Sequence, residues 1–338
     1  MNRDVFFQDF ESIAALPLPW EQLRDKKILI TGATGFIGGY LAKILCRMNE
    51  QMSLGLELGL FHRPGTATGF FSPCIRWIGG NITEDFIPKD FQPDIIIHGA
   101  SPSNRRLIDS DPAGVIDCNI LATRYLLEKA RSSHAHFLFF SSGEVYQRRP
   151  TPIEEEDAAI LARNGSLSFY GGCKLSGELL CKDYQKKYGV NSCILRLFSV
   201  FGPGESLNSG RCFTDFIRQV LQSRKIQVEG PGTQIRSYCY VSDFVSGLFY
   251  ALLRGENTAY NIGNEYNTCS ILEFARQLAK LYGNIEVAGP ASVGGQIDSF
   301  VPDTAKLRKL GWQPQVDLQT CIKRCLESYC ENSETGFK

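Results

Sequence analysis

The strongest constraint on this chain is a glycine-spaced turn in the segment 27–39, KILITGATGFIGG. A β-branched apolar run leads into the turn and an apolar period of about 3.6 residues follows it, so the segment predicts strand, turn and helix. Gly32 permits the tight bend, Gly35 lets the backbone approach a diphosphate, and Gly38 lets the helix lie against the strand. Free N–H groups at the helix N-terminus attract an anion. The segment therefore predicts a dinucleotide-binding site.

Composition narrows the class of protein. The 338 residues suffice for one large α/β domain, or such a domain with a smaller lobe. Lysine plus arginine and aspartate plus glutamate both total 36, so the net charge is zero and neither nucleic acid nor an anionic membrane is an expected partner. No apolar run approaches the roughly 18 to 20 residues of a membrane span, and we expect no leader. We expect a cytoplasmic protein.

The twelve cysteines are scattered along the chain and form no Cys-x-x-Cys pair. Cys321 and Cys325 share a helix face, but no histidine is near them in the sequence. Several cysteines fall in apolar runs. We predict that most are small buried side chains in a reducing compartment, and we predict no metal site.

Short apolar strands alternate with amphipathic helices. Predicted strands after the glycine turn cover 56–61, 74–78, 94–98 and 135–140; an outer helix lies within 2–25, and further helices cover 112–131, 168–188, 244–253 and 271–282. The alternation predicts an α/β fold with a Rossmann-type, doubly wound parallel sheet. The chain length leaves room for a smaller C-terminal α/β lobe, to which the family resemblance described below assigns the substrate. We place a helical extension at 1–25, the dinucleotide-binding domain mainly at 26–200, the substrate lobe mainly at 201–331 with some segments returning to the first domain, a loop-rich cap at 287–302 and a tail at 332–338.

The end of the strand 56–61 decides between nicotinamide cofactors. A carboxylate there would hold a ribose 2′-hydroxyl, whereas a nearby arginine would accept a 2′-phosphate. This chain carries His62 and Arg63. Arg63 favours NADP, but as a solvated charge it is equally compatible with NAD, so the choice between the two stays open.

Two further strand ends face the same crevice. Asn81 and Ile82 follow the strand 74–78, where side chains meet adenine, and the small residues 99–101 follow the strand 94–98 and permit close approach of a dinucleotide. His98 ends that strand in an apolar setting. We expect it to be a satisfied core residue rather than a titrating group.

The chemistry is predicted just beyond the strand 135–140. Ser142 and Glu144 project at the carboxyl edge of the sheet, and Tyr170 and Lys174 share one helix face at i, i+4. A nearby ammonium stabilises a phenolate and lowers the pKa of a tyrosine from its usual value of about 10. Tyr170 is therefore predicted to act as an acid or base, with Ser142 bonding the same substrate hydroxyl.

In this order and spacing, these motifs resemble the extended short-chain dehydrogenase/reductase family, specifically its NAD(P)-dependent nucleotide-sugar epimerases and dehydratases. Four later segments are similar to family landmarks, and the resemblance covers nearly the whole chain. They are RLFSVFGPG at 196–204, QIRSYCYVSD at 234–243, NIGN at 261–264 and KLGWQP at 309–314.

The resemblance implies a nucleotide-diphosphate sugar that is oxidised transiently at C4. Tyr170 would remove the hydroxyl proton, Lys174 would hold the nicotinamide ribose, and Arg236 would hold the diphosphate unless it forms only a structural ion pair. The implied cofactor contacts are Gly32, Thr34, Gly35, Phe36, Ile37, Gly38, His62, Arg63, Asn81, Ile82, Gly99, Ala100, Ser101, Asn119, Ser141, Tyr170, Lys174, Phe198 and Val200. The implied substrate contacts are Ser103, Ser142, Glu144, Ser199, Arg211, Arg236 and Asp298.

Glu144 narrows the implied reaction. The 4,6-dehydratases and UDP-glucuronate decarboxylases of the family resemble this chain in placing a glutamate before Val-Tyr, where it serves proton removal at C5. Two departures oppose those assignments. Phe300 lies near the arginine with which decarboxylases hold the sugar carboxylate, and Gly143 replaces an aspartate that dehydratases use as an acid. Ser199 also stands where many members have asparagine.

The leading hypothesis is therefore a nucleotide-sugar 4,6-dehydratase or epimerase. The alternatives are an NADP-dependent 4-ketosugar reductase, a UDP-glucuronate decarboxylase and a non-enzymatic redox sensor or scaffold. Intact Ser142, Tyr170 and Lys174 oppose the last of these. By analogy with the family, we expect a homodimer through the helices 112–131 and 168–188.

Overall fold

The computed structural model describes residues 3–66, 68–147, 151–157, 168–283, 285–289 and 298–334. Its strands are β1 (Lys27–Thr31), β2 (Glu57–His62), β3 (Ile75–Gly79), β4 (Ile95–His98), β5 (His136–Ser142), β6 (Ser192–Leu197), β7 (Val200–Phe201), β8 (Lys225–Gln227), β9 (Ile235–Ser237), β10 (Cys239–Tyr240), β11 (Ala259–Ile262), β12 (Thr268–Ser270), β13 (Glu286–Ala288) and β14 (Ser299–Phe300). Its α-helices are α1 (Arg3–Ala14), α2 (Phe36–Met52), α3 (Arg105–Ser110), α4 (Pro112–Ile116), α5 (Ala122–Ser133), α6 (Phe169–Tyr188), α7 (Cys212–Ser223), α8 (Val241–Arg254), α9 (Ile271–Tyr282), α10 (Ala305–Arg308) and α11 (Leu318–Glu334).

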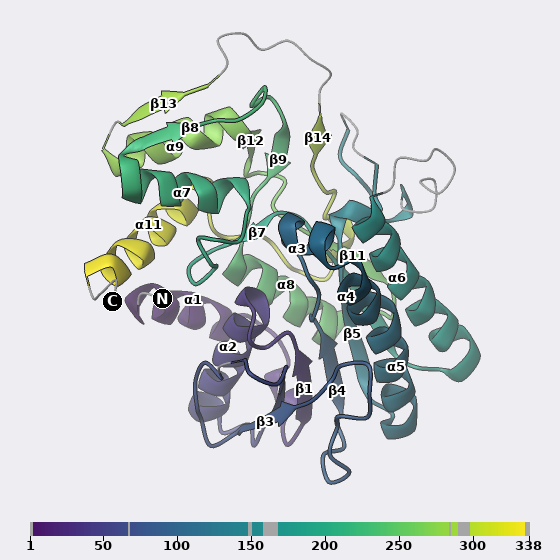
Figure 1. Cartoon of the computed structure of the whole chain (residues 1–338). Coiled ribbons are helices and arrows are strands. Elements are labelled where there is room, and N and C mark those ends of the chain that lie inside the picture. Colours follow the sequence, from purple (N-terminus) through teal and green to yellow (C-terminus); the bar gives the residue numbers. More distant parts are fainter. Residues whose placement is uncertain are drawn as a thin grey trace.

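The centre of the molecule is a seven-stranded sheet of order β3-β2-β1-β4-β5-β6-β11, in which each neighbouring pair is parallel (Figure 1). The chain winds outward from β1 to β3 and then returns to β4 on the other side of β1. Such a reversal opens a crevice at the carboxyl ends of the two central strands. The predicted Rossmann-type doubly wound sheet is confirmed.

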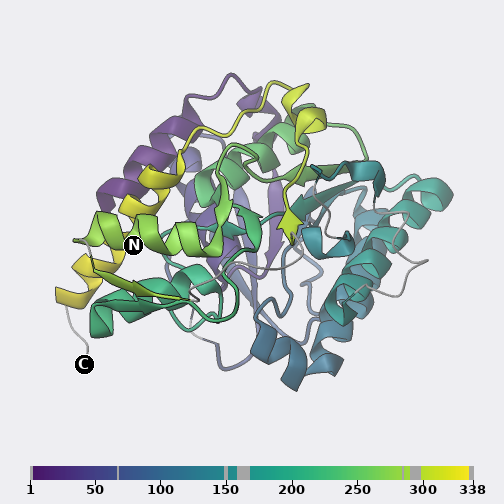
Figure 2. The same ribbon diagram turned by 90° about the horizontal axis from the view of Figure 1, so that it is seen from above.

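Successive side chains of the strands point to opposite faces of the sheet and contribute to two separate apolar cores. Ile28 and Ile30 face a large core with α2 and α8, whereas Leu29 faces a second core with α5 and α6. The strands read as nearly continuous apolar runs because both faces of a parallel sheet are covered. Figure 2, the view from above, shows these helices on both sides of the strands.

A second group of elements stands above the carboxyl edge of the sheet (Figure 1). It contains three small sheets, β10-β7, β12-β9-β14 and β13-β8, with the helices α7 and α9. The strand β11 returns from this region to the edge of the main sheet beside β6. The segment 290–297 of the predicted cap lies outside the described residues.

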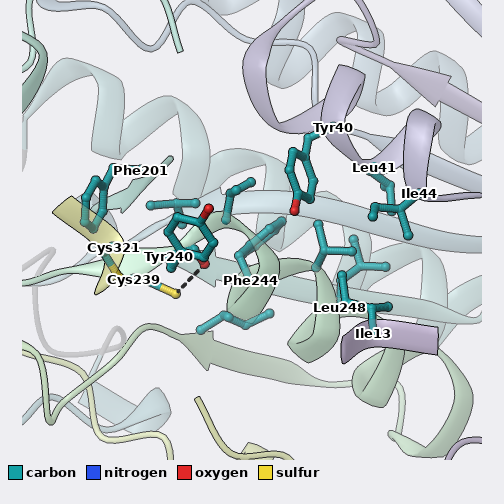
Figure 3. Close-up of a cluster of buried hydrophobic side chains, with 14 of the residues drawn as sticks. Ile13, Tyr40, Leu41, Ile44, Phe201, Cys239, Tyr240, Phe244, Leu248 and Cys321 are labelled. Carbon is teal, nitrogen blue, oxygen red and sulfur yellow. Dashed lines mark hydrogen bonds between the residues drawn. The ribbon is translucent and has the colours of Figure 1, made fainter. Parts of the chain in front are cut away.

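The N-terminal helix α1 belongs to the large core. Phe10 and Ile13 are buried against α2 and α8, and Figure 3 shows Ile13 beside side chains of both helices. The carboxylate of Asp9 is also buried and accepts hydrogen bonds from the phenols of Tyr40 (2.8 Å) and Tyr240 (3.0 Å). Arg324 of α11 donates to the same carboxylate at 2.6 Å. Helix α1 therefore joins α2, β10 and α11.

Most predicted elements occur within a residue or two of the predicted bounds, but the helix predicted over 112–131 is interrupted. It begins with α4, widens into a π-helical turn at Asp117–Leu121 and continues as α5. Eight of the twelve cysteines are buried, as predicted. None of the described helices combines the length and the apolar character that crossing a membrane requires.

Candidate active site

The glycine turn leaves no room for side chains. Gly32 has a φ of +79°, and a Cβ on it would lie 2.8 Å from the backbone of Gly99 and Ala100. A Cβ on Gly38 would lie 2.3 Å from the carbonyl oxygen of Gly32. Gly35 begins α2 without a side-chain cap among the described residues, so the first N–H groups of the helix are left for an anion. This cradle fits a dinucleotide pyrophosphate, with Thr34 exposed and Phe36 and Ile37 half-buried beside it.

The neighbouring strand end is held by hydrogen bonds. Thr31 Oγ1 lies 2.7 Å from His98 Nδ1, and His98 Nε2 lies 2.9 Å from the carbonyl oxygen of Cys118. Burial lowers the pKa of His98 to about 3, so the imidazole is neutral and satisfied, as expected. The amide of Ala100 donates to Thr31 Oγ1 at 3.3 Å. The strand exit 99–101 is thus fixed beside the glycine turn.

The predicted ribose and adenine residues lie at the ends of β2 and β3. Arg63 is exposed, and His62 is half-buried with its ring edge-on to Trp77. Asn81 is exposed and bonds Glu84 and Thr83 of its own turn, while Ile82 is buried in the second core.

Beyond this crevice lies a cavity of about 570 Å³ at the carboxyl edge of the sheet. It is lined on one side by residues from the end of β5 and the start of α6, and on the other by residues of α7 and β9. Phe300 of β14 lies between β9 and Gly143. Its lining includes the predicted residues Ser103, Ser142, Glu144, Tyr170, Ser199, Arg211 and Arg236. Residues that the chain separates by up to 197 positions, from Ser103 to Phe300, therefore line one space.

Tyr170 and Lys174 occupy the first turns of α6, which Ser168 caps by accepting a hydrogen bond from the Gly171 amide. The Lys174 ammonium is buried, donates to the Phe140 carbonyl oxygen at 2.6 Å and lies 5.8 Å from the centre of the Tyr170 ring. Burial lowers the pKa of Lys174 to about 7. It also raises the pKa of Tyr170 to about 12, although a hydrogen bond with Ser101 opposes the shift.

The predicted lowering of the Tyr170 pKa is therefore not seen. Desolvation of the phenol outweighs nearby positive charge, and the opposing charge comes from Arg211 rather than from Lys174.

Ser142 and Glu144 sit on the short helical turn that follows β5. The Ser142 hydroxyl caps this turn by accepting a hydrogen bond from the Glu144 amide at 3.1 Å. Between them, Gly143 carries no side chain because the ring of Phe300 lies there: a Cβ would approach its Cζ to 2.6 Å. Phe300 stacks at a tilt on Phe198 at 4.9 Å and lines the cavity next to Glu144. The wall beside Glu144 is therefore aromatic.

A buried ion pair behind the cavity was not predicted. Arg196 of β6 donates from Nε and a terminal nitrogen to the two carboxylate oxygens of Glu178, at 2.8 Å and 2.6 Å. Both side chains are almost fully buried, and the Ser141 hydroxyl donates to Glu178 at 2.5 Å. Glu178 follows Lys174 by one helical turn, so the pair fixes α6 against β5 and β6. Two features of the sequence could have indicated this pair: Arg196 interrupts an apolar strand, and Glu178 follows Lys174 at i, i+4 on the same helix face.

The opposite wall carries two arginines. Arg236 pairs with Asp298 through both carboxylate oxygens, at 3.3 Å and 3.1 Å. It also lines the cavity, so Arg236 both forms an ion pair within the protein and faces the space proposed for the substrate. Arg211 donates to the Val200 carbonyl oxygen at 2.6 Å and lies 3.6 Å from Glu205. Ser199 adopts a φ of +39°, a left-handed conformation that asparagine tolerates better.

Three other predicted cofactor residues are buried. Phe198 and Val200 belong to apolar clusters. Asn119 lies in the π-helical turn, where its amide nitrogen donates to the Val115 carbonyl oxygen and its side-chain oxygen has no partner among the described residues. Among those residues, no group of three or more His, Cys, Asp or Glu side chains is placed to hold a metal ion.

Comparison with known proteins identifies the family. Residues 28–263, from β1 to the end of β11, match the model of the NAD-dependent epimerase/dehydratase family. The chain belongs to this family. It is therefore an NAD(P)-dependent enzyme of the extended short-chain dehydrogenase/reductase group, which confirms the resemblance drawn from its motifs.

Individual relatives cover most of the chain. UDP-glucuronic acid decarboxylase 6 of Arabidopsis thaliana is 31% identical over 308 residues, 87% of this chain and 86% of the relative. The UDP-glucuronic acid 4-epimerase of Bacillus cereus, solved with UDP-glucuronic acid and NAD, superposes with a TM-score of 0.76 at 27% identity over 90% of this chain and 99% of that one. A dTDP-glucose 4,6-dehydratase from Bacillus anthracis, TM-score 0.74 at 22% identity over 91% and 98%, shares the fold.

Proposed function

We propose that this family member oxidises C4 of a nucleotide-diphosphate sugar, uses Glu144 in a second step at C5, and then returns the hydride. The product would come from 4,6-dehydration or epimerisation. The observation that carries this proposal is that Tyr170, Ser142 and Glu144 line one cavity with two arginines opposite them. A proton acceptor, a hydroxyl-positioning group, a carboxylate and diphosphate-binding cations are thus combined.

In this proposal Tyr170 takes the proton of the C4 hydroxyl on its phenolic oxygen, while Ser142 orients that hydroxyl. The bound NAD(P) supplies a hydride acceptor and, when oxidised, a positive charge. Because the pKa of Tyr170 is raised to about 12, the phenol needs added positive charge to act near neutral pH. Lys174, held by Phe140, would bind the nicotinamide ribose and keep its ammonium on the same side.

Glu144 would act after C4 has become a ketone, when the C5 proton is acidic. Phe300 and Gly143 place an aromatic ring beside it, so this part of the cavity favours a neutral C6 group over a carboxylate that would lie beside the Glu144 carboxylate. This supports a hexose substrate. The same ring fills the space in which a second acid would stand.

UDP-glucuronate decarboxylation is the second candidate, because curated relatives with that activity are up to 31% identical over most of the chain. Decarboxylation of the 4-keto acid at C5 would need a cation for the carboxylate. In the described part of the cavity lining, Arg211 and Arg236 are the arginines. Arg236 lies one strand from Phe300 and is already paired with Asp298. Arg211 donates to the Val200 carbonyl oxygen. The aromatic ring at Gly143 therefore disfavours a carboxylate at C6, and it also occupies the place of the acid that 4,6-dehydratases use for the loss of water.

The choice of NAD or NADP depends on the end of β2. Arg63 is exposed at this strand end, where an arginine can bind a 2′-phosphate. Neither His62 nor Arg63 supplies the carboxylate that would bind a ribose hydroxyl. We propose that both cofactors be compared, since NADP would also suit a one-way 4-ketosugar reductase.

We also propose a homodimer through α4, α5 and α6. Exposed apolar side chains gather on these helices and the turn between α4 and α5, and they include Ile116, Leu121, Leu179 and Tyr188. Burying such residues against a second copy would remove them from water. Light scattering of the purified protein tests this, and a monomer at micromolar concentration would contradict it. Cytoplasmic location stays a proposal as well.

A panel of nucleotide sugars tests the function. The purified protein, with NAD or NADP, is incubated with UDP- and dTDP-glucose, UDP-galactose and UDP-glucuronic acid, and products are followed by mass and absorbance. Loss of water from a neutral hexose supports dehydration, and an isomer of unchanged mass supports epimerisation. Loss of carbon dioxide from UDP-glucuronic acid would establish the second candidate. Stoichiometric oxidation of NADPH in a separate incubation with a nucleotide 4-ketosugar would establish a reductase.

A further inference from the structure

Two cysteines far from the cavity lie in contact. The sulfur of Cys74, just before β3, is 3.4 Å from the sulfur of Cys46 in the second half of α2. They belong to the dinucleotide-binding half, at the end of α2 remote from the glycine turn. The two cysteines have no part in the proposed reaction.

The surroundings of the pair differ between the two sulfurs. Cys46 is almost fully buried, whereas Cys74 is half-buried and its sulfur also lies 3.4 Å from the Ser72 hydroxyl. Hydrogen bonds from Cys46, Ser72 and Asn49 lower the pKa of Cys74. In the neutral pair the Cys74 thiol donates to the Cys46 sulfur. When Cys74 loses its proton, Cys46, whose own pKa is raised, keeps its proton and donates to the Cys74 thiolate. The more accessible sulfur is therefore the more nucleophilic one.

The segment that carries Cys74 already lies along α2. The Lys43 ammonium stands 5.4 Å from the centre of the Phe70 ring, and the Trp77 indole donates to the Phe70 carbonyl oxygen at 3.2 Å. Closing the sulfur separation from 3.4 Å to the roughly 2.05 Å of a disulfide needs a shift of little more than 1 Å. The two sulfurs therefore already lie in van der Waals contact.

We propose that Cys46 and Cys74 form a redox-active pair that a low-molecular-weight disulfide, such as oxidised glutathione, converts into an intramolecular disulfide. The Cys74 thiolate attacks one sulfur of the small disulfide, forms a mixed disulfide and releases one small thiolate. The Cys46 thiol then loses its proton and attacks the Cys74 sulfur, which releases the second small thiol. The protein loses two electrons, and the small disulfide is reduced to two thiols.

The bond would close a loop that contains the end of α2, all of β2 and the residues His62 and Arg63. Cross-linking this loop restricts the unfolded chain, so the oxidised protein should unfold at a temperature several degrees higher than the reduced protein.

The test uses the full chain, first reduced with dithiothreitol and then exposed to oxidised glutathione. We expect a loss of two hydrogens from the intact mass and a linked peptide that contains Cys46 and Cys74. The Cys46→Ser variant should stop at the mixed disulfide, with one glutathione on Cys74, and the Cys74→Ser variant should acquire neither product. Cys330→Ser, a half-buried cysteine of α11, is the matched control and should oxidise like the parent protein.

Several outcomes would overturn the proposal: an unchanged mass, a linked peptide from another pair of cysteines, or a glutathione adduct that persists on Cys74 while Cys46 is intact. A Cys74→Ser variant that still forms the linked product at the parent rate would do so as well. Melting curves of the oxidised and reduced parent, compared with those of both serine variants, separate the effect of the cross-link from that of the substitutions.

Discussion

The two walls of the cavity are built in different ways. The wall that carries Ser142, Glu144 and Tyr170 belongs to β5 and α6, and the buried pair of Glu178 and Arg196 holds these elements together. The opposite wall carries Arg211 and Arg236 on short strands and a helix start, where their ion pairs remain partly open to solvent. The proposed reacting groups thus stand on elements joined by a buried ion pair, and the proposed binding groups stand on elements whose ion pairs are partly solvated.

This contrast matches what each wall must do. Proton transfer depends on positions within fractions of an ångström, whereas binding a flexible diphosphate tolerates small shifts. It follows that substitutions on the first wall should affect turnover and folding strongly, and that substitutions on the second should affect mainly substrate affinity.

The largest effect is expected for Tyr170→Phe. The change removes the proposed proton acceptor and keeps the ring, so turnover should fall by about 10³-fold or more while cofactor binding stays within about twofold. Steady-state turnover and a cofactor titration measure the two quantities. Turnover within tenfold of the parent protein would exclude Tyr170 as the base.

The support of that wall is tested by Glu178→Gln. Removal of one partner leaves the Arg196 guanidinium buried without its counter-charge, so the free energy of unfolding should fall by about 3 to 5 kcal/mol. Urea denaturation measures it. The matched control is Asp183→Asn, which breaks an exposed pair with Lys187 on the same helix and should leave the free energy of unfolding unchanged within the error of the measurement. Equal losses in both variants would refute the contrast.

Glu144→Gln separates two steps on the same wall. The first hydride transfer should persist, because Tyr170 and Ser142 are unchanged, while overall product formation should fall by about 10²-fold. Single-turnover absorbance of the reduced cofactor and product mass distinguish the steps. Normal product formation would remove the argument for chemistry at C5.

Asp9, a buried carboxylate outside the cavity, tests how a buried ion pair affects stability when it titrates. Burial raises the pKa of Asp9 from 3.8 to about 6 despite its pairing with Arg324. Between these values the folded protein keeps a proton that the unfolded chain has released, so the free energy of unfolding falls as pH rises through this range. Asp9→Asn should reduce that fall by an amount of the order of 2 kcal/mol, measured by urea denaturation between pH 4 and 6. An unchanged pH profile would show that Asp9 does not titrate there.

The smallest effect is expected on the second wall. Arg236→Lys keeps the charge and loses the two-pronged contact, so KM for the nucleotide sugar should rise about tenfold while turnover changes by less than about threefold. Stability should change by less than about 1 kcal/mol, because the pair with Asp298 is partly solvated. A loss of turnover without a change in KM would place Arg236 in the chemistry instead of the binding.

Local patterns account for what the sequence predicted well. The spacing of Gly32, Gly35 and Gly38 requires close backbone contacts, and the i, i+4 spacing of Tyr170 and Lys174 follows from the helix itself. The carboxyl ends of parallel strands meet at one edge, which is why Ser142 could be expected at the crevice, whereas Arg236 was expected there only from the family resemblance.

What the sequence did not predict depends on packing between distant segments. The pairing of Glu178 with Arg196 and the contact of Phe300 with Gly143 arise only when β6 and β14 are in place. The raised pKa of Tyr170 reflects desolvation, which no spacing in the sequence reports. The π-helical turn at Asp117–Leu121 likewise interrupts a helix whose periodic pattern is continuous.

The hydrogen bond between Asp9 and Arg324 joins residues 315 positions apart. During synthesis on the ribosome, the first helix must wait for almost the entire chain before its carboxylate meets the guanidinium. Helix α1 should consequently be among the last elements to reach its final packing. In a nascent chain halted before residue 324, that helix should be cleaved by proteases while the glycine turn and its strands are already protected.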